Sequence, residues 1–287
     1  LAQLSEIQEQ MKNYNTTVNQ LTTKINELTL TIDEMTGDVV SIGKCGQNVD
    51  FVLYSDGRLL LKGTGATFDY STDSNPSPFL DNANVKSVIV SEGITGIGER
   101  LFQYCNNLKT ASLPTTLTTI KRSAFMPHID EYLSHQVLNG LTELRIPERV
   151  AELGVNAFAG TAIKSVTVPS SVVTVGAMVF TECQNLETVR YSGKTISDRM
   201  FARCISLKNL TLTKSVREII GGCFNYCEKL TQITYEGSLA DWNAVKKNNN
   251  WDGHSNSTTE TPLTKIQCLD GYMEYVAGTK TWKEVKS

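Results

Sequence analysis

Cysteine is the residue type with the widest chemistry in this sequence, because a thiolate can form a disulfide, bind zinc or act as a nucleophile. The chain has seven cysteines, and no two of them have the two-residue spacing typical of a zinc site. Four of them recur three residues after a phenylalanine and three residues before a leucine: Cys105, Cys183, Cys204 and Cys227. Packing alone explains such a recurring position, so we expect all the thiols to be reduced.

Histidine offers a second candidate chemistry in the segment 126–140. If residues 129–138 are helical, His128, Glu131 and His135 lie on one helix face, where a metal ion or an acid–base step can be imagined. The two histidines would be about two turns, or ~10 Å, apart, too far to converge on one ion. We therefore expect no metal, and a plain surface helix is the alternative.

No sequence motif of a known catalytic site is present. The serine nucleophile elbow, the phosphate-binding loop with its lysine and the paired-histidine zinc helix are all missing from the sequence. The chain has only three histidines. We expect no enzyme activity and no cofactor.

The four phenylalanines that precede these cysteines and two looser copies, Phe125 and Phe158, repeat at a nearly constant interval. They lie at Phe102, Phe125, Phe158, Phe180, Phe201 and Phe224, so the interval is close to 22 residues except across the insertion after Phe125. A fixed period of about 22 residues is typical of a stack of structural repeats. Each unit is too small to bury its own apolar face, so neighbouring units build one continuous core.

A short apolar pattern accompanies each phenylalanine. Two apolar residues separated by one polar residue end each copy, and this alternation predicts a short strand with one buried face. The copies occupy residues 85–90, 108–113, 141–146, 163–168, 186–191, 207–212 and 230–235. We expect these seven strands to form one parallel sheet.

These repeats resemble the BspA-type leucine-rich repeats of bacterial surface proteins. The resemblance covers roughly residues 45–270, and the segments 45–49 and 235–238 with Trp242 are similar to the ends of such repeat regions. Thr161 in place of cysteine and the insertion after Phe125 depart from the pattern. The resemblance implies an α+β solenoid, a right-handed leucine-rich-repeat stack with β-rich caps at both ends. It also implies a bacterial cell-surface or secreted location.

The first 36 residues carry a different period. Apolar residues alternate in steps of three and four, which is the heptad seam of a coiled coil. The seam consists of Leu4, Ile7, Met11, Tyr14, Val18, Leu21, Ile25, Leu28, Ile32 and Met35. Isoleucine at the first core position and leucine at the second favour a parallel homodimer, and a homotrimer stays open. The alternative is a helix that folds back on its own repeats.

The chain divides into four expected parts. A coiled-coil stalk occupies residues 1–36, an N-terminal β cap 37–83, the repeats 84–237 with the insertion 126–140, and a C-terminal cap 238–287. Asp56-Gly57 between two apolar runs predicts a hairpin in the first cap. Trp242, Trp251 and Trp282 are expected to seal the last repeat, with sugar stacking as the alternative.

The outward positions of the predicted strands form a stripe rich in hydroxyl groups, with two arginines near its middle. Such groups suit a peptide or glycan, although threonine is also favoured on any half-exposed strand. The candidate ligand residues are Thr110, Ser112, Glu143, Arg145, Ser165, Thr167, Thr188, Arg190, Asn209 and Thr211.

Composition limits the partners. A net charge of -3 gives no basis for nucleic-acid binding, and no apolar run is long enough for a membrane span. We expect a non-catalytic surface or secreted adhesion protein whose repeats bind a protein or glycan ligand on a host or neighbouring cell. The alternative is a structural oligomerisation scaffold in which the coiled coil assembles the chain and the repeat domain is a passive head.

Overall fold

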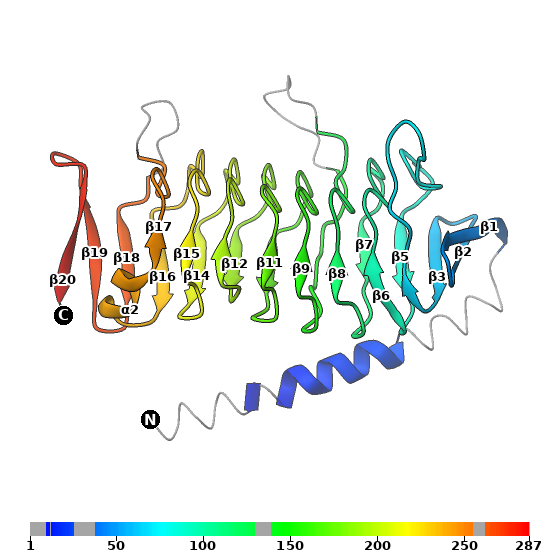
Figure 1. The fold of residues 1–287 in the computed structure, drawn as a ribbon, viewed down its shortest axis with the longest axis horizontal. Helices are drawn as coiled ribbons and strands as arrows, with labels where there is room; N and C mark the ends of the chain where they lie inside the picture. Colours follow the sequence, from blue (N-terminus) through cyan, green and yellow to red (C-terminus); the bar gives the residue numbers. More distant parts are fainter. Residues whose placement is uncertain (1–9, 12, 26–37, 130–138, 255–261, 287) are drawn as a thin grey trace.

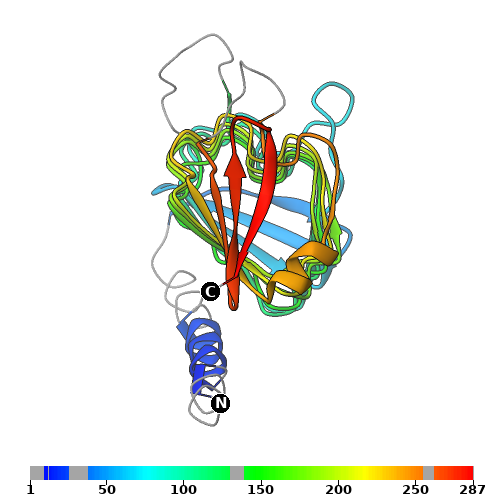
Figure 2. The ribbon, with the colours of Figure 1, turned by 90° about the vertical axis from the view of Figure 1, so that its left-hand side faces the viewer.

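The computed structural model describes residues 10–11, 13–25, 38–129, 139–254 and 262–286. The chain forms a row of similar turns stacked side by side, with a short helix at residues 13–25 alongside (Figure 1). Viewed along the row, successive turns superimpose (Figure 2). The structure is therefore a repeat fold with many short strands in parallel sheets, while the handedness of the stack and the domain boundaries stay predictions.

The main ladder of strands, which contains the repeat strands predicted from the sequence, is divided into two sheets. The first has the order β1-β2-β3-β5-β7 and the second β10-β12-β14-β16-β18-β19-β20. The first sheet consists of β1 (Val39–Gly46), β2 (Val49–Tyr54), β3 (Arg58–Gly63), β5 (Ser87–Val90) and β7 (Thr110–Ser112). The second consists of β10 (Ser165–Val168), β12 (Thr188–Tyr191), β14 (Asn209–Thr213), β16 (Gln232–Glu236), β18 (Lys265–Cys268), β19 (Gly271–Val276) and β20 (Thr281–Lys286).

Six of the seven predicted strands are present, and the expectation of one continuous sheet was wrong. Residues 141–146 form no strand although the structure describes all of them, so the main ladder is interrupted between β7 and β10. The corresponding inward residue is small in β7, where it is Ala111, and Leu144 in the next turn is only half-buried. Weak inward packing in this turn and in β7 before it accounts for the missing strand.

A second ladder of very short strands runs along another side of the turns. It also has two parts, with the orders β11-β9-β8-β6-β4 and β13-β15-β17. Its members are β4 (Gly65–Ala66), β6 (Ile94–Ile97), β8 (Thr119–Ile120), β9 (Glu152–Leu153), β11 (Thr174–Val175), β13 (Thr195–Ile196), β15 (Glu218–Ile219) and β17 (Lys246–Lys247). The sequence predicted only turns here. The interruption in this ladder lies between β11 and β13, one turn beyond the interruption in the main ladder.

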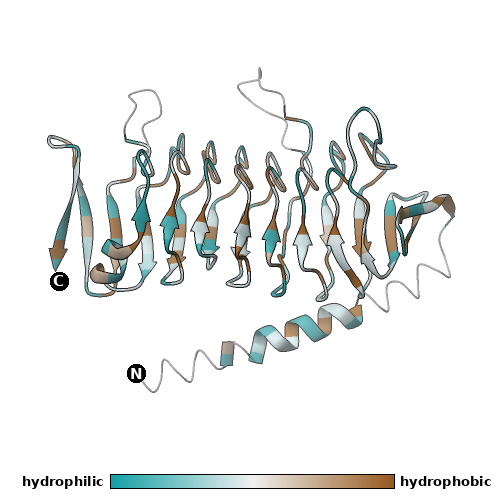
Figure 3. Cartoon of the chain, viewed as in Figure 1, coloured by the Kyte–Doolittle hydropathy of each residue, from teal (hydrophilic) through white to brown (hydrophobic). Residues whose placement is uncertain are grey.

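The predicted phenylalanine ladder is present in the core. Each ring from Phe79 to Phe224 is at most 2% exposed. Neighbouring ring centroids lie 5.1–6.2 Å apart, and from Phe125 onward the ring planes are within 8° of parallel. Phe79 and Phe51 extend the ladder into the N-terminal cap, which the 22-residue spacing did not reveal. Hydrophobic bands recur at equivalent places in successive turns (Figure 3).

The cysteines form a second ladder beside the rings. All seven are free and buried. The Cys204 thiol donates to the carbonyl of Phe180 in the preceding turn at 3.2 Å, and Cys227 donates to Phe201 at 3.1 Å. Thr161 replaces cysteine in one turn, and its hydroxyl donates to the Phe158 carbonyl at 2.9 Å. The Phe180 and Phe201 carbonyls also accept from the backbone N–H groups of Cys183 and Cys204 in their own turns, at 3.4 and 3.1 Å, so each thiol adds a hydrogen bond between neighbouring turns.

Both caps close the ends of the core. In the N-terminal cap, β2 and β3 form the predicted hairpin, and β3 pairs in parallel with β5. In the C-terminal cap, the short helix α2 (Leu239–Ala244) begins with a capping box made by Ser238 and Asp241. Trp242 and Trp251 are buried with ring centroids 5.6 Å apart, as a sealing role requires. Among the described helices, none has the length and apolar character needed to cross a bilayer.

Replacing a ring in the middle of the ladder should be costly. We expect Phe180→Ala to lower the free energy of unfolding by ~3–5 kcal/mol, because the cavity lies between two fixed rings and cannot collapse. Phe68, which is 45% exposed, supplies the control, and Phe68→Ala should change stability by less than ~1 kcal/mol. Urea denaturation measures both changes. Equal effects would contradict a special contribution of the stacked rings to the free energy of unfolding.

The buried thiols predict a loss of stability at alkaline pH. Burial disfavours the thiolate and raises the pKa of every cysteine, to about 12 for Cys105 and Cys183. In the unfolded chain these thiols deprotonate near pH ~8.5. The free energy of unfolding should therefore be undiminished below pH ~8.5 and fall above it, by up to ~1.4 kcal/mol per pH unit for each thiol. Burial lowers the pKa of Lys247 to about 8, so this one group raises the free energy of unfolding as the pH rises above 8 and partly offsets the effect of the thiols.

Urea denaturation between neutral pH and pH ~10 tests this expectation. Cys204→Ala removes one buried thiol and should give a measurably shallower decline. A stability that stays constant across this range would contradict it.

Candidate functional site

The candidate ligand residues lie on the outward face of the main ladder. Thr110 and Ser112 are on β7, Ser165 and Thr167 on β10, Thr188 and Arg190 on β12, and Asn209 and Thr211 on β14. Glu143 and Arg145 are in the turn that has no strand. All ten side chains are exposed or half-buried, so the predicted alternation of inward and outward residues is present where strands form.

The two arginines of this stripe have different environments. The Arg190 guanidinium donates to both carboxylate oxygens of Glu236, at 2.7 and 2.8 Å, reaching across β14 to β16. This pair lowers the pKa of Glu236 and raises the pKa of Arg190. Arg190 is thus committed to an ion pair within the chain, which the sequence did not reveal because Glu236 lies 46 residues away.

The interruption in the main ladder leaves backbone groups without partners. The Thr142 N–H donates to the Lys109 carbonyl at 3.0 Å, but residues 143–146 make no backbone hydrogen bond to β7 or β10 in the described structure. Peptide groups in such a position are available to water or to a ligand. A hollow of about 600 Å³ lies here, between Thr110 and Ser165, with Glu143, Arg145 and Lys164 at its rim.

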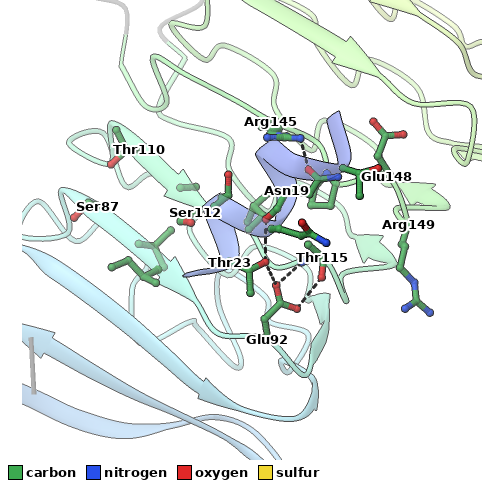
Figure 4. Close-up of a pocket in the computed structure, with 18 of the residues that line it drawn as sticks. Asn19, Thr23, Ser87, Glu92, Thr110, Ser112, Thr115, Arg145, Glu148 and Arg149 are labelled. Atoms are coloured by element: carbon green, nitrogen blue, oxygen red, sulfur yellow. Dashed lines mark hydrogen bonds between the residues drawn. The ribbon is translucent and has the colours of Figure 1, made fainter. Parts of the chain in front are cut away.

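A second hollow of about 740 Å³ lies between the N-terminal helix and the first turns (Figure 4). The helix contributes Asn19 and Thr23 to its wall, and the repeats contribute Ser87, Ser112 and Arg145 among others. Arg145 therefore borders both hollows. We call the two together the repeat groove.

Polar contacts join the helix to the repeats. The Arg145 guanidinium donates to the Asn19 side-chain carbonyl, and the Thr23 hydroxyl donates to Glu92 at 3.4 Å. The Glu92 carboxylate also accepts from the Thr115 backbone N–H at 2.9 Å and the Thr115 hydroxyl at 3.0 Å, which fixes its position (Figure 4). A helix folded back on its own repeats was the alternative predicted from the sequence, but these contact residues were not identified, and the available signal was the run of Asn and Thr on the side of the helix opposite the apolar seam.

The helix therefore lies against its own repeats, but not by its apolar seam. Of the seam residues that the structure describes, Val18 is half-buried, and the exposed fractions of the others, Met11, Tyr14, Leu21 and Ile25, are 54–71%. The remaining seam residues, Leu4, Ile7, Leu28, Ile32 and Met35, lie outside the described residues. The structure shows a helix at residues 13–25, and the coiled coil stays a prediction.

The candidate metal chemistry has little support in the part of the chain that the structure describes. No cluster of three or more potential ligands occurs among those residues. His128 is exposed, its ring lies 5.2 Å from that of Tyr104, and its backbone N–H donates to Asn106 at 2.8 Å. Glu131 and His135 lie outside the described residues.

A model of the BspA type leucine rich repeat region matches six copies in this sequence, over residues 67–138 and 128–246. The chain belongs to the BspA-type leucine-rich repeat family. The predicted resemblance is confirmed, and the repeat groove is a surface of a BspA-type domain. No curated protein matches the chain.

Several solved structures are similar to this BspA-type chain. A leucine-rich repeat protein from Eubacterium ventriosum is 19% identical over 81% of this chain and 73% of its own, with a TM-score of 0.49. One from Bacteroides ovatus is 15% identical over 78% and 76%, with a TM-score of 0.43. One from T. pallidum is 21% identical over 64% and 88%, with a TM-score of 0.46. All three scores are below 0.5, so the family assignment rests on the repeat model.

The unpaired backbone at the interruption should be visible in hydrogen exchange. We expect amides 143–146 to exchange at least ~10-fold faster than amides 189–191 of β12, which lie inside the second sheet. Mass spectrometry of peptides covering the two segments in the native protein provides the comparison. Equal protection would show that the main ladder is continuous in solution.

Proposed function

We propose that this chain is a non-catalytic bacterial binding protein, displayed on the cell surface or secreted, whose repeat groove holds a protein or glycan ligand. The location follows from what the family resemblance implies. The binding role is supported by the groove, since a repeat fold presents a long surface whose irregular turns carry specificity.

Arg145 is the observation that carries the proposal. It borders both hollows and lies in the turn whose backbone is unpaired, next to exposed hydroxyl groups of Thr110 and Ser165. A guanidinium with adjacent hydroxyls and free peptide groups can bind carboxylates, peptide carbonyls or sugar hydroxyls. Arg190, by contrast, is paired with the Glu236 carboxylate, whereas Arg145 donates to the uncharged Asn19 side chain. The proposed ligand site is therefore centred on Arg145 rather than spread along the whole stripe.

The scaffold alternative is not favoured. A repeat domain with no ligand requires only a closed core and a soluble surface. The interrupted sheet with a hollow over it is not explained by that function. The stripe of threonines by itself does not distinguish the two functions, because half-exposed strands favour threonine in any protein.

Substitution of the two arginines tests the site. On arrays of glycans and extracellular-matrix proteins, we expect Arg145→Ala to weaken binding ~10–100-fold, the usual loss for a hydrogen bond to a charged group. Arg190→Ala is the matched control, and it should bind like the unaltered chain because its guanidinium is already paired. Arg145→Lys should restore only part of the affinity, since one ammonium cannot replace a planar fork.

Two outcomes would contradict this proposal. Binding that is insensitive to Arg145→Ala would exclude the site, and an equal loss with Arg190→Ala would place the ligand across the stripe. An unaltered chain that binds no component of either array would support the scaffold function.

A further inference from the structure

The N-terminal helix has two faces with separate surroundings. If the apolar seam occupies heptad positions a and d, Thr16 and Thr23 fall at f and Asn19 at b, on the side opposite the seam. These three residues line the repeat groove. Figure 2 shows the helix on the outer side of the stack, with the turns to one side of it only. Docking on the repeats therefore leaves Met11, Tyr14, Leu21 and Ile25 of the seam uncovered.

The uncovered seam needs an apolar partner. Met11, Tyr14, Leu21 and Ile25 are at least 54% exposed, on a helix that contacts the repeats through the hydrogen bonds of Asn19 and Thr23. A short single helix is marginal in water without burial of its apolar face. The described repeats offer no such burial, which favours a partner from outside this chain.

The spacing of the seam identifies the kind of partner. Alternating steps of three and four residues, kept over more than four heptads in the sequence, fit another helix with the same spacing and not a flat surface. Among the described positions that flank the seam, Gln10, Asn15, Thr17 and Thr22 carry no charge, and Lys24 alone is charged. A single charge among neutral flanking residues repels an identical helix little, and it gives no charge pattern that selects a different one.

We infer that the seam pairs with the same helix of a second copy of this chain while the opposite face stays on the chain's own repeat groove. Each helix is then both an assembly element and a wall of the groove. Assembly and groove formation become coupled, because pairing stabilises the helix that closes the first hollow. This inference does not depend on which ligand the groove holds.

The mass of the native chain in solution tests the pairing. We expect sedimentation equilibrium to give a concentration-dependent oligomer, and Leu21→Lys with Ile25→Lys to give a monomer. Asn13→Lys with Gln20→Lys adds the same charge at two exposed c positions, which neither belong to the seam nor flank it, and should leave the oligomer intact. A chain that is monomeric at every soluble concentration, or a seam variant that still assembles, would overturn the inference.

A cross-link tests whether docking and pairing coexist. Asn19→Cys with Arg145→Cys puts two thiols at the observed contact, and the native cysteines are buried. A short bis-maleimide should join these positions within one chain in the oligomeric fraction, and less often when the seam carries the two lysines. An oligomer without this cross-link, or equal cross-linking in the seam variant, would show that the coupling is absent.

Discussion

The structure depends on keeping one aromatic ring directly over the next. Ring centroids 5.1–6.2 Å apart are close to the spacing between neighbouring strands, so a turn of 21–23 residues must return its phenylalanine to the same place. The left-handed backbone at Met178 and Glu182, on both sides of Phe180, is one device that fixes this return. The hydrogen bonds of both strand ladders and of the thiols follow from the registration of the rings.

Features with a period were predictable from the sequence, and contacts between distant residues were not. The rings from Phe102 onward, six strands and the cap hairpin follow from local spacing. The strands of the second ladder, two residues long except for the four-residue β6, are too short for any period to appear. The pairing of Arg190 with Glu236 joins strands that are not adjacent, and spacing within a single strand contains no information about it.

The candidate site shows the same division. Its outward residues were predictable because strand alternation assigns them a face. The missing strand at 141–146 was not, because its pattern matches that of its neighbours, and what differs is the packing of Ala111 and Leu144 against the core. The residues of the helix contact were not predictable for another reason. The heptad pattern consists of the apolar residues, whereas the helix contacts the repeats through polar residues. The repeats thus provide a regular frame, and the proposed binding chemistry lies where that frame is irregular.

The two ladders are interrupted at different turns. The main ladder stops between β7 and β10, where β8 and β9 of the second ladder remain paired, and the second ladder stops between β11 and β13, where β10 and β12 remain paired. The two interruptions therefore lie at different turns, and no plane across the stack passes through both of them. A stretching force on the two ends would meet at least one hydrogen-bonded ladder at each interruption. The domain can therefore bend at an interruption while the other ladder holds the neighbouring turns together.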